Sequence, residues 1–595
     1  MKFRLFLCLA LGIPMGALSQ WSSDPSVNTM VAGTGLDRTF PKIIASPQGT
    51  FYISNWQQLY DKNDNYHLWL QQVDANGYLL WGTDGIQVSD QPCDTWLSDY
   101  SLKVDNTGNA ILAMEDLRGG TGFSHVSVYS IAPDKHAVWD TNGIQVNMGD
   151  YDSHSPVIAL TNDHNVLVAW NGDRPDIFGD KFFIRIQKLS PEGVPLWTEP
   201  ISVTDGDSTS IFPNLLPVGD DEFILVWQRK FEKGTGLGRE WYTYIYAQRY
   251  DANGQPVWPN KVAICDHGDS AYVVPEFIIL YPVQDEHQGI IVAWPDDRFE
   301  TDYSNIYIQQ VDSAGNLKWP VNGIAVSPFN AGYDRVEPMV AFEPASQATY
   351  VFWDEYRAIG IYDSFGMLGQ KIGADGSLRW GDLGKVFAGF TMDTIWYLTS
   401  TKETPSGDMV LLVDRGFDSI IGPDTVTFDQ LFAMRIDTAG NLTWPQHQAL
   451  MAATEGTKFY PRMSDLSGDI YVVSWGENRN SQFDPEGAVF AQNITLDGNL
   501  GPAGIPQNSG TEQEISIRPN PTAEGSWLVF YKPVSGTVDL ALFSSAGQLI
   551  FSSPVRPESQ DQKIWLDTGL LSSGMYMVRI RNQGKESHVK WLIIR

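Results

Sequence analysis

Acidic residues recur beside arginine along this chain, a pairing that could form internal ion pairs or hold a charged ligand. The pairs are Asp116 with Arg118, Asp173 with Arg174, Asp297 with Arg298, Glu355 with Arg357, Asp414 with Arg415, and Glu477 with Arg479. A pair that returns in equivalent segments is best explained as part of a repeated scaffold, because a ligand site needs only one copy. We therefore predict that these pairs brace loops.

Other carboxylates stand at alternating positions in polar segments, the arrangement with which loops can ligate calcium, a hard cation that prefers oxygen. The metal candidates are Asp150, Asp152, His154, Asp205, Asp207, Asp266 and Asp269. Solvated acidic loops are the simpler interpretation. No cofactor is otherwise evident, so calcium is the one that we consider.

Aromatic residues in the same kind of segment are candidates for a binding face. They are Trp96, Tyr151, Trp241, Tyr242 and Tyr303. The chain contains no His-Glu-x-x-His, no Gly-x-Ser-x-Gly and no Walker loop, and its nine histidines are scattered. Catalytic residues therefore stay unknown.

The elements that would position these residues form a long repeat. An Asp/Gly turn precedes a tryptophan again and again, with spacings from 58 (139−81) to 64 (444−380) residues. The tryptophans are Trp81, Trp139, Trp197, Trp258, Trp319, Trp380 and Trp444. Each unit holds four short apolar segments of strand length. A further tryptophan ends the second segment in most units, at Trp56, Trp170, Trp227, Trp294, Trp353 and Trp475.

A glutamine recurs in the third segment, at Gln71, Gln187, Gln248, Gln309, Gln370 and Gln492. Eight four-stranded units without helical periodicity predict an all-β fold, an eight-bladed β-propeller followed by a small C-terminal β-sandwich. The eighth unit lacks the tryptophan that should open its fourth strand. Trp21 lies 60 residues (81−21) before Trp81, so the N-terminal strand around Trp21 is expected to close the last blade; residues 499–508 are the alternative.

In such a ring, the loops between second and third strands and those between blades open on one face. These connections are the long, polar ones, so this face is the predicted binding surface.

The composition of the chain limits the classes of partner that it can bind. With 40 Lys plus Arg against 71 Asp plus Glu, the net charge of −31 disfavours nucleic acid and anionic membranes. Residues 1–19 read as a signal peptide, and no later segment is long and apolar enough to span a membrane. Only Cys93 and Cys265 follow it, too few for a disulfide framework. We expect residues 20–498 to form the propeller, as a monomer.

Residues 499–514 read as a linker, and residues 515–595 as a separate domain. That domain opens with Pro519, Asn520 and Pro521, and continues with the Gly547 turn, the Gly574-Met-Tyr576 strand and a last strand that contains Lys590. In this order the motifs resemble the type A C-terminal sorting domain of the Bacteroidetes type IX secretion system. Trp591 in the last strand departs slightly from the family pattern. The resemblance implies that the domain engages the secretion machinery and is removed, leaving the protein secreted or on the outer-membrane surface.

Three functions remain open. We favour a non-catalytic binding propeller for a glycan or a protein, since the repeated residues look structural. The alternatives are a secreted glycoside hydrolase or polysaccharide lyase, whose acid and base would come from different blades, and an adhesin or structural envelope component.

Overall fold

A computed structural model shows the fold of the chain between residues 21 and 593. Short stretches inside this range are not described: 34–36, 60–64, 94–99, 119, 121, 148, 150, 175–180, 205–208, 234–239, 267–279, 299–302, 331, 360–361, 422–423, 455, 479–486, 502–514, 519–524, 531–536, 545–548, 557–562, 570, 572–573 and 583–584. The predicted signal peptide, residues 1–19, lies outside the described residues.

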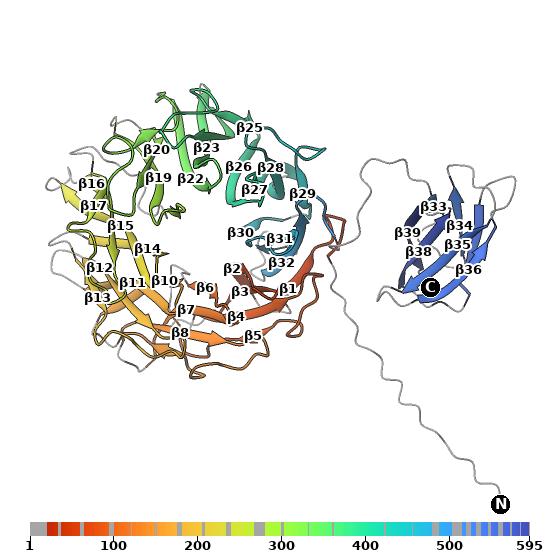
Figure 1. Cartoon of the computed structure of the whole chain (residues 1–595), viewed down its shortest axis with the longest axis horizontal. Coiled ribbons are helices and arrows are strands. Elements are labelled where there is room, and N and C mark those ends of the chain that lie inside the picture. Colours follow the sequence, from red (N-terminus) through yellow and green to blue (C-terminus); the bar gives the residue numbers. More distant parts are fainter. Residues whose placement is uncertain are drawn as a thin grey trace, which may run out of the picture. The chain divides into compact units, whose positions relative to one another are not determined.

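The described chain forms two compact units, Met1–Ala503 and Gly504–Arg595. The first unit consists of eight four-stranded antiparallel sheets, which we call blades 1 to 8, and Figure 1 shows them around a common axis. The predicted all-β fold with eight four-stranded units is confirmed.

Blade 1 consists of β2 (Arg38–Ala45), β3 (Phe51–Gln58), β4 (Tyr66–Val73) and β5 (Ile86–Gln87), and blade 2 of β6 (Ser101–Val104), β7 (Ala110–Asp116), β8 (His125–Ile131) and β9 (Ile144–Gln145). Blade 3 consists of β10 (Asp152–Leu160), β11 (Val166–Arg174), β12 (Lys181–Leu189) and β13 (Ile201–Val203), and blade 4 of β14 (Thr209–Val218), β15 (Glu222–Lys233), β16 (Glu240–Tyr250) and β17 (Val262–Cys265). Blade 5 consists of β18 (Val283–Gln284), β19 (Ile290–Asp296), β20 (Asn305–Val311) and β21 (Ile324–Ala325), and blade 6 of β22 (Tyr333–Glu343), β23 (Ala348–Ile359), β24 (Tyr362–Ile372) and β25 (Lys385–Thr391). Blade 7 consists of β26 (Thr394–Glu403), β27 (Met409–Ile421), β28 (Asp424–Ile436) and β29 (Ala449–Ala452), and blade 8 of β30 (Lys458–Met463), β31 (Ile470–Glu477), β32 (Ala488–Thr495) and β1 (Thr29–Ala32).

The N-terminus supplies the fourth strand of blade 8. β1 pairs antiparallel with β32, with Thr29 opposite Ala491. Trp21 precedes this strand and is buried; its backbone N–H donates to the Asn76 carbonyl at 3.1 Å and its indole N–H to the Ala75 carbonyl at 3.0 Å. The two ends of the ring are therefore joined by pairing across the whole length of the propeller sequence.

The tryptophans that follow the Asp/Gly turns join neighbouring blades. In five of the seven, the indole N–H donates to a carbonyl in the turn of the next blade: Trp81 to Pro133, Trp139 to Pro191, Trp197 to Ala252, Trp258 to Ser313 and Trp444 to Leu496. The indole N–H groups of Trp319 and Trp380 have no hydrogen-bond partner among the described residues. A Cβ added at the turn residue Gly193 would come within 2.8 Å of the Trp139 ring, so the turn must present glycine where it covers the indole. Packing between blades is thus the role of the repeated tryptophan.

The repeated glutamine ties the third strand of a blade to the start of the fourth. In blade 5 the Gln309 side chain donates to the carbonyl of Pro320 at 2.8 Å and accepts from the backbone N–H of Gln310 and Trp319 at 3.0 and 3.1 Å. The glutamine satisfies backbone groups that the hairpin turn leaves unpaired, as expected for a scaffold residue.

The tryptophans that end the second strands face the preceding blade. Trp353 packs with Ile291 and Ala293 of blade 5. Trp56 is the exception: it packs with Leu112 and Met114 of blade 2, so its predicted equivalence to the others is wrong. Because side chains alternate along a strand, the residue of blade 1 that faces the preceding blade, as these tryptophans do in other blades, is Asn55.

The innermost strands share a local distortion. In blades 1, 3, 4, 6 and 8 a bulge in the first strand places a residue with positive φ directly before a proline, at Phe40 (φ 50°), Ser155 (52°), Phe212 (54°), Glu337 (52°) and Tyr460 (52°). Bulky residues rarely adopt this conformation, so it marks positions where a side chain is redirected at an energetic cost.

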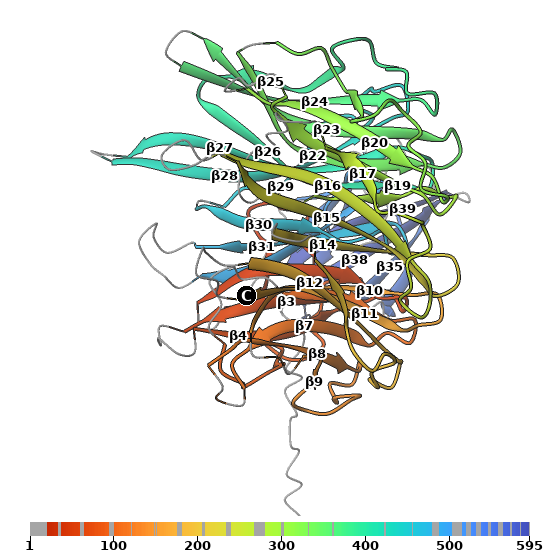
Figure 2. The same cartoon turned by 90° about the vertical axis from the view of Figure 1, so that its left-hand side faces the viewer.

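The second and third strands of blades 4, 6 and 7 are long. β27 and β28 each contain 13 residues, whereas β7 and β8 each contain seven. Figure 2 shows β27 and β28 extending beyond the other blades on one side of the ring. This side carries the loops between second and third strands, which were predicted to form the binding face.

The second unit is a sandwich of two small sheets. One has the order β33 (Ile515–Arg518), β34 (Gly525–Phe530), β37 (Lys563–Asp567), and the other β36 (Leu549–Val555), β35 (Val538–Ser544), β38 (Gly574–Asn582), β39 (Lys585–Ile593). Their core includes Leu528, Leu540, Val578 and Trp591, whose indole N–H donates to the Ser526 hydroxyl at 2.8 Å. Within the described residues, no helix is long and apolar enough to span a membrane.

Candidate functional site at the axis of the propeller

The predicted binding-face aromatics are not gathered by the structure into one platform. Tyr151 is buried, with its ring 5.1 Å from that of Phe183, and Tyr303 is half-buried. Trp241 and Tyr242 lie in β16, but their side chains, like all of Trp96, are outside the described residues. Tyr151 therefore contributes to packing between strands.

The structure describes some of the predicted metal ligands, and it does not bring them together into a site. Asp152 accepts from the Ser124 backbone N–H at 2.8 Å, His154 Nδ1 lies 3.2 Å from Glu115 Oε2, and the exposed Asp266 donates its backbone N–H to Asn322. The remaining candidates, Asp150, Asp205, Asp207 and Asp269, lie outside the described residues. In the part of the chain that the structure describes, no three His, Cys, Asp or Glu side chains are grouped as a metal site would require.

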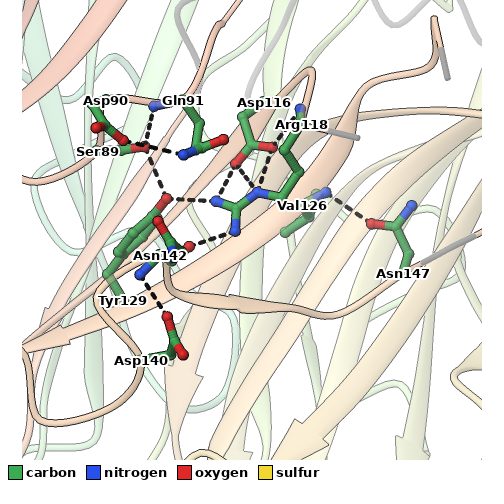
Figure 3. Close-up of polar contacts among 10 residues, drawn as sticks. All are labelled: Ser89, Asp90, Gln91, Asp116, Arg118, Val126, Tyr129, Asp140, Asn142 and Asn147. Atoms are coloured by element: carbon green, nitrogen blue, oxygen red, sulfur yellow. Dashed lines mark hydrogen bonds and ion pairs between the residues drawn. The ribbon is translucent and has the colours of Figure 1, made fainter. Parts of the chain in front are cut away.

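The acid–arginine pair of blade 2 is a structural brace, as Figure 3 shows. Arg118 donates to Asp116, 2.6 Å between Nη2 and Oδ2, to the Tyr129 hydroxyl and to the Asn142 carbonyl. The Asp116 carboxylate is fully buried, and these bonds join the end of the second strand to the start of the fourth.

Blade 5 repeats the brace with a different partner from the one predicted. Arg298 binds Asp296, 2.6 Å between Nη2 and Oδ2, and not Asp297. Asp296 also accepts the indole N–H of Trp294 at 2.9 Å, because alternate residues of a strand share a face. In blade 6, Glu355 binds both Arg357 and Arg335, while in blade 8 the cation beside Glu477 is Lys458 at 3.4 Å. Arg479 is outside the described residues.

The predicted pair of blade 7 is wrong: Asp414 Oδ1 and Arg415 Nε have no hydrogen-bond partner among the described residues, and Arg415 donates to the side chain of Gln430 instead. The side chain of Arg174 is outside the described residues.

A different set of residues is exposed at the axis. Tyr397 of β26 and Phe459 and Tyr460 of β30 are 38%, 40% and 46% exposed. Both strands are the first of their blades, and Figure 1 shows the first strands nearest the axis. The Tyr460 ring stacks on Phe40 of blade 1 with 4.1 Å between centroids. Aromatic residues exposed on the inner strands, beside strained backbone at Phe40 and Tyr460, are typical of a ligand site.

Two carboxyl groups of blade 6 lie beside these rings. Glu337 is exposed at a left-handed bulge, and the surrounding protein raises the pKa of its carboxyl, an effect that Arg462 of blade 8 partly opposes. Asp354 is buried and, among the described residues, accepts the Leu398 backbone N–H of blade 7, at 3.1 and 3.3 Å to its two oxygens. Burial raises the pKa of Asp354 well above its usual value, and Glu337 adds to the shift.

The same acids act on Tyr397. Burial raises the pKa of the Tyr397 hydroxyl, and Asp414, Glu337 and Asp354 raise it further. Neutral carboxyl and hydroxyl groups can donate hydrogen bonds as well as accept them. The axis between blades 6 and 8 therefore combines aromatic surfaces with hydrogen-bonding groups, the composition of a site for a polar ligand.

A second group of buried acids belongs to blade 7 and contacts blade 8. Asp414 and Asp429 are buried on adjacent strands; burial raises the pKa of both carboxyls, that of Asp414 well above its usual value. Asp429 accepts the backbone N–H of Lys458 at 2.9 Å, and the Lys458 ammonium donates to the carbonyls of Thr454 and Gly456. These groups support the first strand of blade 8, which carries Tyr460.

Sequence reasoning missed the axis. The available signal was the proline that recurs in the first strands, at Pro41, Pro156, Pro213, Pro338 and Pro461, since each follows a redirected residue.

The structure describes part of the predicted sorting motif. Tyr576 is buried in the sandwich core, Gly574 begins β38, and Lys590 in β39 is paired with Met577. Pro519, Asn520, Pro521 and Gly547 lie outside the described residues.

Comparisons with known proteins place the second unit in a family. Residues 516–595 match the secretion system C-terminal sorting domain. No curated protein sequence matches the chain.

Solved structures resemble the fold at low identity. A fungal alcohol oxidase of the AA5 family, in complex with copper, is 12% identical with a TM-score of 0.37, covering 97% of this chain and 100% of that one. The α-L-arabinofuranosidase Arb93A from Fusarium graminearum is 10% identical (TM-score 0.32; 57% and 94% covered), and the Penicillium chrysogenum α-L-arabinanase complexed with arabinobiose is 13% identical (TM-score 0.32; 58% and 94% covered). At these scores the likeness carries no argument about activity.

The sorting domain fixes the destination of the protein. Its match at residues 516–595 confirms the resemblance drawn from the Tyr576 and Lys590 segments. The chain therefore carries a Bacteroidetes type IX secretion C-terminal sorting domain behind a propeller of four-stranded blades, and is a secreted or outer-membrane surface protein.

Proposed function

We propose that the propeller is a non-catalytic module that binds a neutral glycan at the axis between blades 6, 7, 8 and 1. The observation that carries this proposal is the exposure of Tyr397, Phe459 and Tyr460 on first strands. Aromatic faces stack on the apolar faces of sugar rings, while neighbouring polar groups bind hydroxyls. The net charge of −31 disfavours polyanions and leaves neutral glycans as the preferred class.

The test is retention of the full chain on neutral and acidic polysaccharides, compared with the double variant Tyr397→Ala/Tyr460→Ala. We expect retention on a neutral polysaccharide and at least a tenfold weaker affinity for the double variant. Val321→Ala serves as the control, because Val321 is 70% exposed in a turn of blade 5, away from the first strands. Equal retention of the wild type and the double variant would place the ligand elsewhere and overturn the proposal.

A glycoside hydrolase is the second candidate, favoured by the raised pKa of the exposed Glu337 carboxyl. A carboxyl whose pKa is raised holds its proton to a higher pH, as a general acid on a glycosidic oxygen must. Release of oligosaccharides by the wild type, abolished in Glu337→Gln with retention unchanged, would establish this activity. Retention without products would support the binding module.

A further inference from the structure

One buried position in the first strands holds a cation in some blades and a serine in others. It lies three residues before the recurring proline, and its occupants are Arg38, Ser153, Ser210, Arg335 and Lys458, all 3% exposed or less. Where the occupant is charged, the second strand of the same blade must neutralise it, because an isolated buried charge is strongly destabilising.

Blades 6 and 8 meet this requirement with a glutamate directly opposite in the strand register. Arg335 is paired with Glu355, with Nε 2.7 Å from Oε2. Lys458 is paired with Glu477, with Nζ 3.4 Å from Oε1. In both blades the cation and the carboxylate are buried together.

Blade 1 breaks the pattern. Arg38 occupies the same position and is 1% exposed, but the residue opposite it is Gln57. Among the residues that the structure describes, no carboxylate lies within ion-pair distance of Arg38; Asp84 only attracts it from further away. Arginine stays protonated under ordinary conditions, so the charge cannot be lost instead.

The side chains in contact with Arg38 include further hydrogen-bond donors. Arg38 Nη1 donates to Asn55 Oδ1 at 3.4 Å, and the guanidinium carbon lies 4.1 Å from the centre of the Trp69 ring. Asn55 and Trp69 are opposite each other across β3 and β4. Four buried N–H-bearing atoms of this cluster have no acceptor in the described part of the chain: Arg38 Nε and Nη2, Asn55 Nδ2 and Trp69 Nε1.

The cluster lies where the ring closes. Ile53, on the same face of β3 as Asn55, packs with Val31 of β1 and Val489 of β32. The Arg38 backbone N–H donates to the Gly487 carbonyl, just before β32, at 2.8 Å. We call this contact between blades 1 and 8 the closing seam.

We infer that the closing seam holds a small inorganic anion of chloride size, bound by the guanidinium of Arg38, the side-chain amide of Asn55 and the indole N–H of Trp69. The anion takes the place that the glutamate carboxylate has in blades 6 and 8. A cluster of donors around a positive charge selects an acceptor with negative charge over water, which would satisfy the donors but leave the charge. The site stabilises the seam.

The substitution Gln57→Glu tests the inference, because it supplies the missing carboxylate. The melting temperature of the full chain is measured in sodium chloride, in sodium bromide and in sodium gluconate at equal ionic strength. We expect chloride and bromide to raise the wild-type melting temperature by roughly 2–4 °C over gluconate. Gln57→Glu should melt higher in gluconate and lose the response to halide. Gln255→Glu, the same change at an exposed turn, should keep the response.

Crystals soaked in bromide give the direct measurement. An anomalous peak beside Arg38, Asn55 and Trp69 in the wild type, absent in Gln57→Glu, would support the site. Identical melting in halide and gluconate with no anomalous peak would overturn it, and so would a halide response that persists in Gln57→Glu.

Discussion

The side-chain amide of Gln492 in β32 donates to the carbonyl oxygen of Ser22 at 3.0 Å, across 470 positions of sequence. Its side-chain oxygen accepts the backbone N–H of Asn493 at 3.0 Å. Gln309 makes the corresponding bonds to Pro320 and Gln310 within one hairpin. The bond that elsewhere fixes a local turn therefore closes the propeller in blade 8.

Replacing Gln492 by methionine should loosen the N-terminal strand. The change leaves buried backbone groups without partners, at a cost of about 1–3 kcal/mol. Hydrogen exchange should rise in β1 and β32, where the partner strand is held by few other bonds. The control is Gln309→Met, whose effect should stay within blade 5. Equal protection of β1 in both variants would contradict a special role in closure.

Replacing Lys135 by glycine should stabilise blade 2. Lys135 has a φ of 79° in the turn above Trp81, where other blades have glycine, for example Gly193 with a φ of 82°. Relief of this backbone strain should raise the free energy of unfolding by roughly 1 kcal/mol. Urea denaturation measures the gain. Gly193→Ala is the reverse control and should destabilise, since its Cβ would meet the Trp139 ring; a loss of stability in Lys135→Gly would contradict the argument.

Removing the charge of Asp296 should lower the free energy of unfolding. Its carboxylate is fully buried and binds both Arg298 and Trp294, so Asp296→Asn leaves a buried cation without its partner, at about 3–5 kcal/mol. Asp375→Asn is the matched control, because the Asp375–Arg379 pair is exposed to solvent and its loss should change stability far less. Thermal and urea unfolding compare the two. Similar losses would show that the Asp296 pair is not a brace.

The repeat could be predicted from the sequence because its marks are local. A turn glycine, the tryptophan after it and the glutamine before it all act within one hairpin or on the next blade, so their spacing gives the blades directly. The missing tryptophan of blade 8 pointed to Trp21 for the same reason, and β1 indeed pairs with β32.

The predictions were wrong where a shift of one residue along a strand changes the face of the sheet on which a side chain lies. Trp56 has the type expected of a residue facing the preceding blade, yet Asn55 has that direction, and Asp296 rather than Asp297 binds Arg298. The axis was missed for another reason: Tyr397, Glu337 and Tyr460 come from three strands distant in sequence, and only the closed ring brings them to one place.

Replacing Asp354 by asparagine should change how stability depends on pH. Blade 3 offers the precedent, since Asn171 Oδ1 accepts the Phe212 backbone N–H at 3.2 Å, as Asp354 accepts that of Leu398. Because the amide oxygen keeps this bond without a charge, Asp354→Asn should fold as the wild type does.

The direction in which stability changes with pH follows from proton binding by Asp354. Burial raises the pKa of Asp354 well above its usual value, so the folded chain binds this proton more tightly than the unfolded chain. The stability this gives is complete below the unfolded pKa of about 3.9 and is lost as pH rises toward the folded pKa. Urea unfolding at pH 4, 6 and 8 should therefore find the two proteins similar at pH 4 and the variant more stable at pH 8, by at least about 1 kcal/mol. A difference that does not vary with pH would show that folding does not raise the pKa of Asp354, and would contradict the argument.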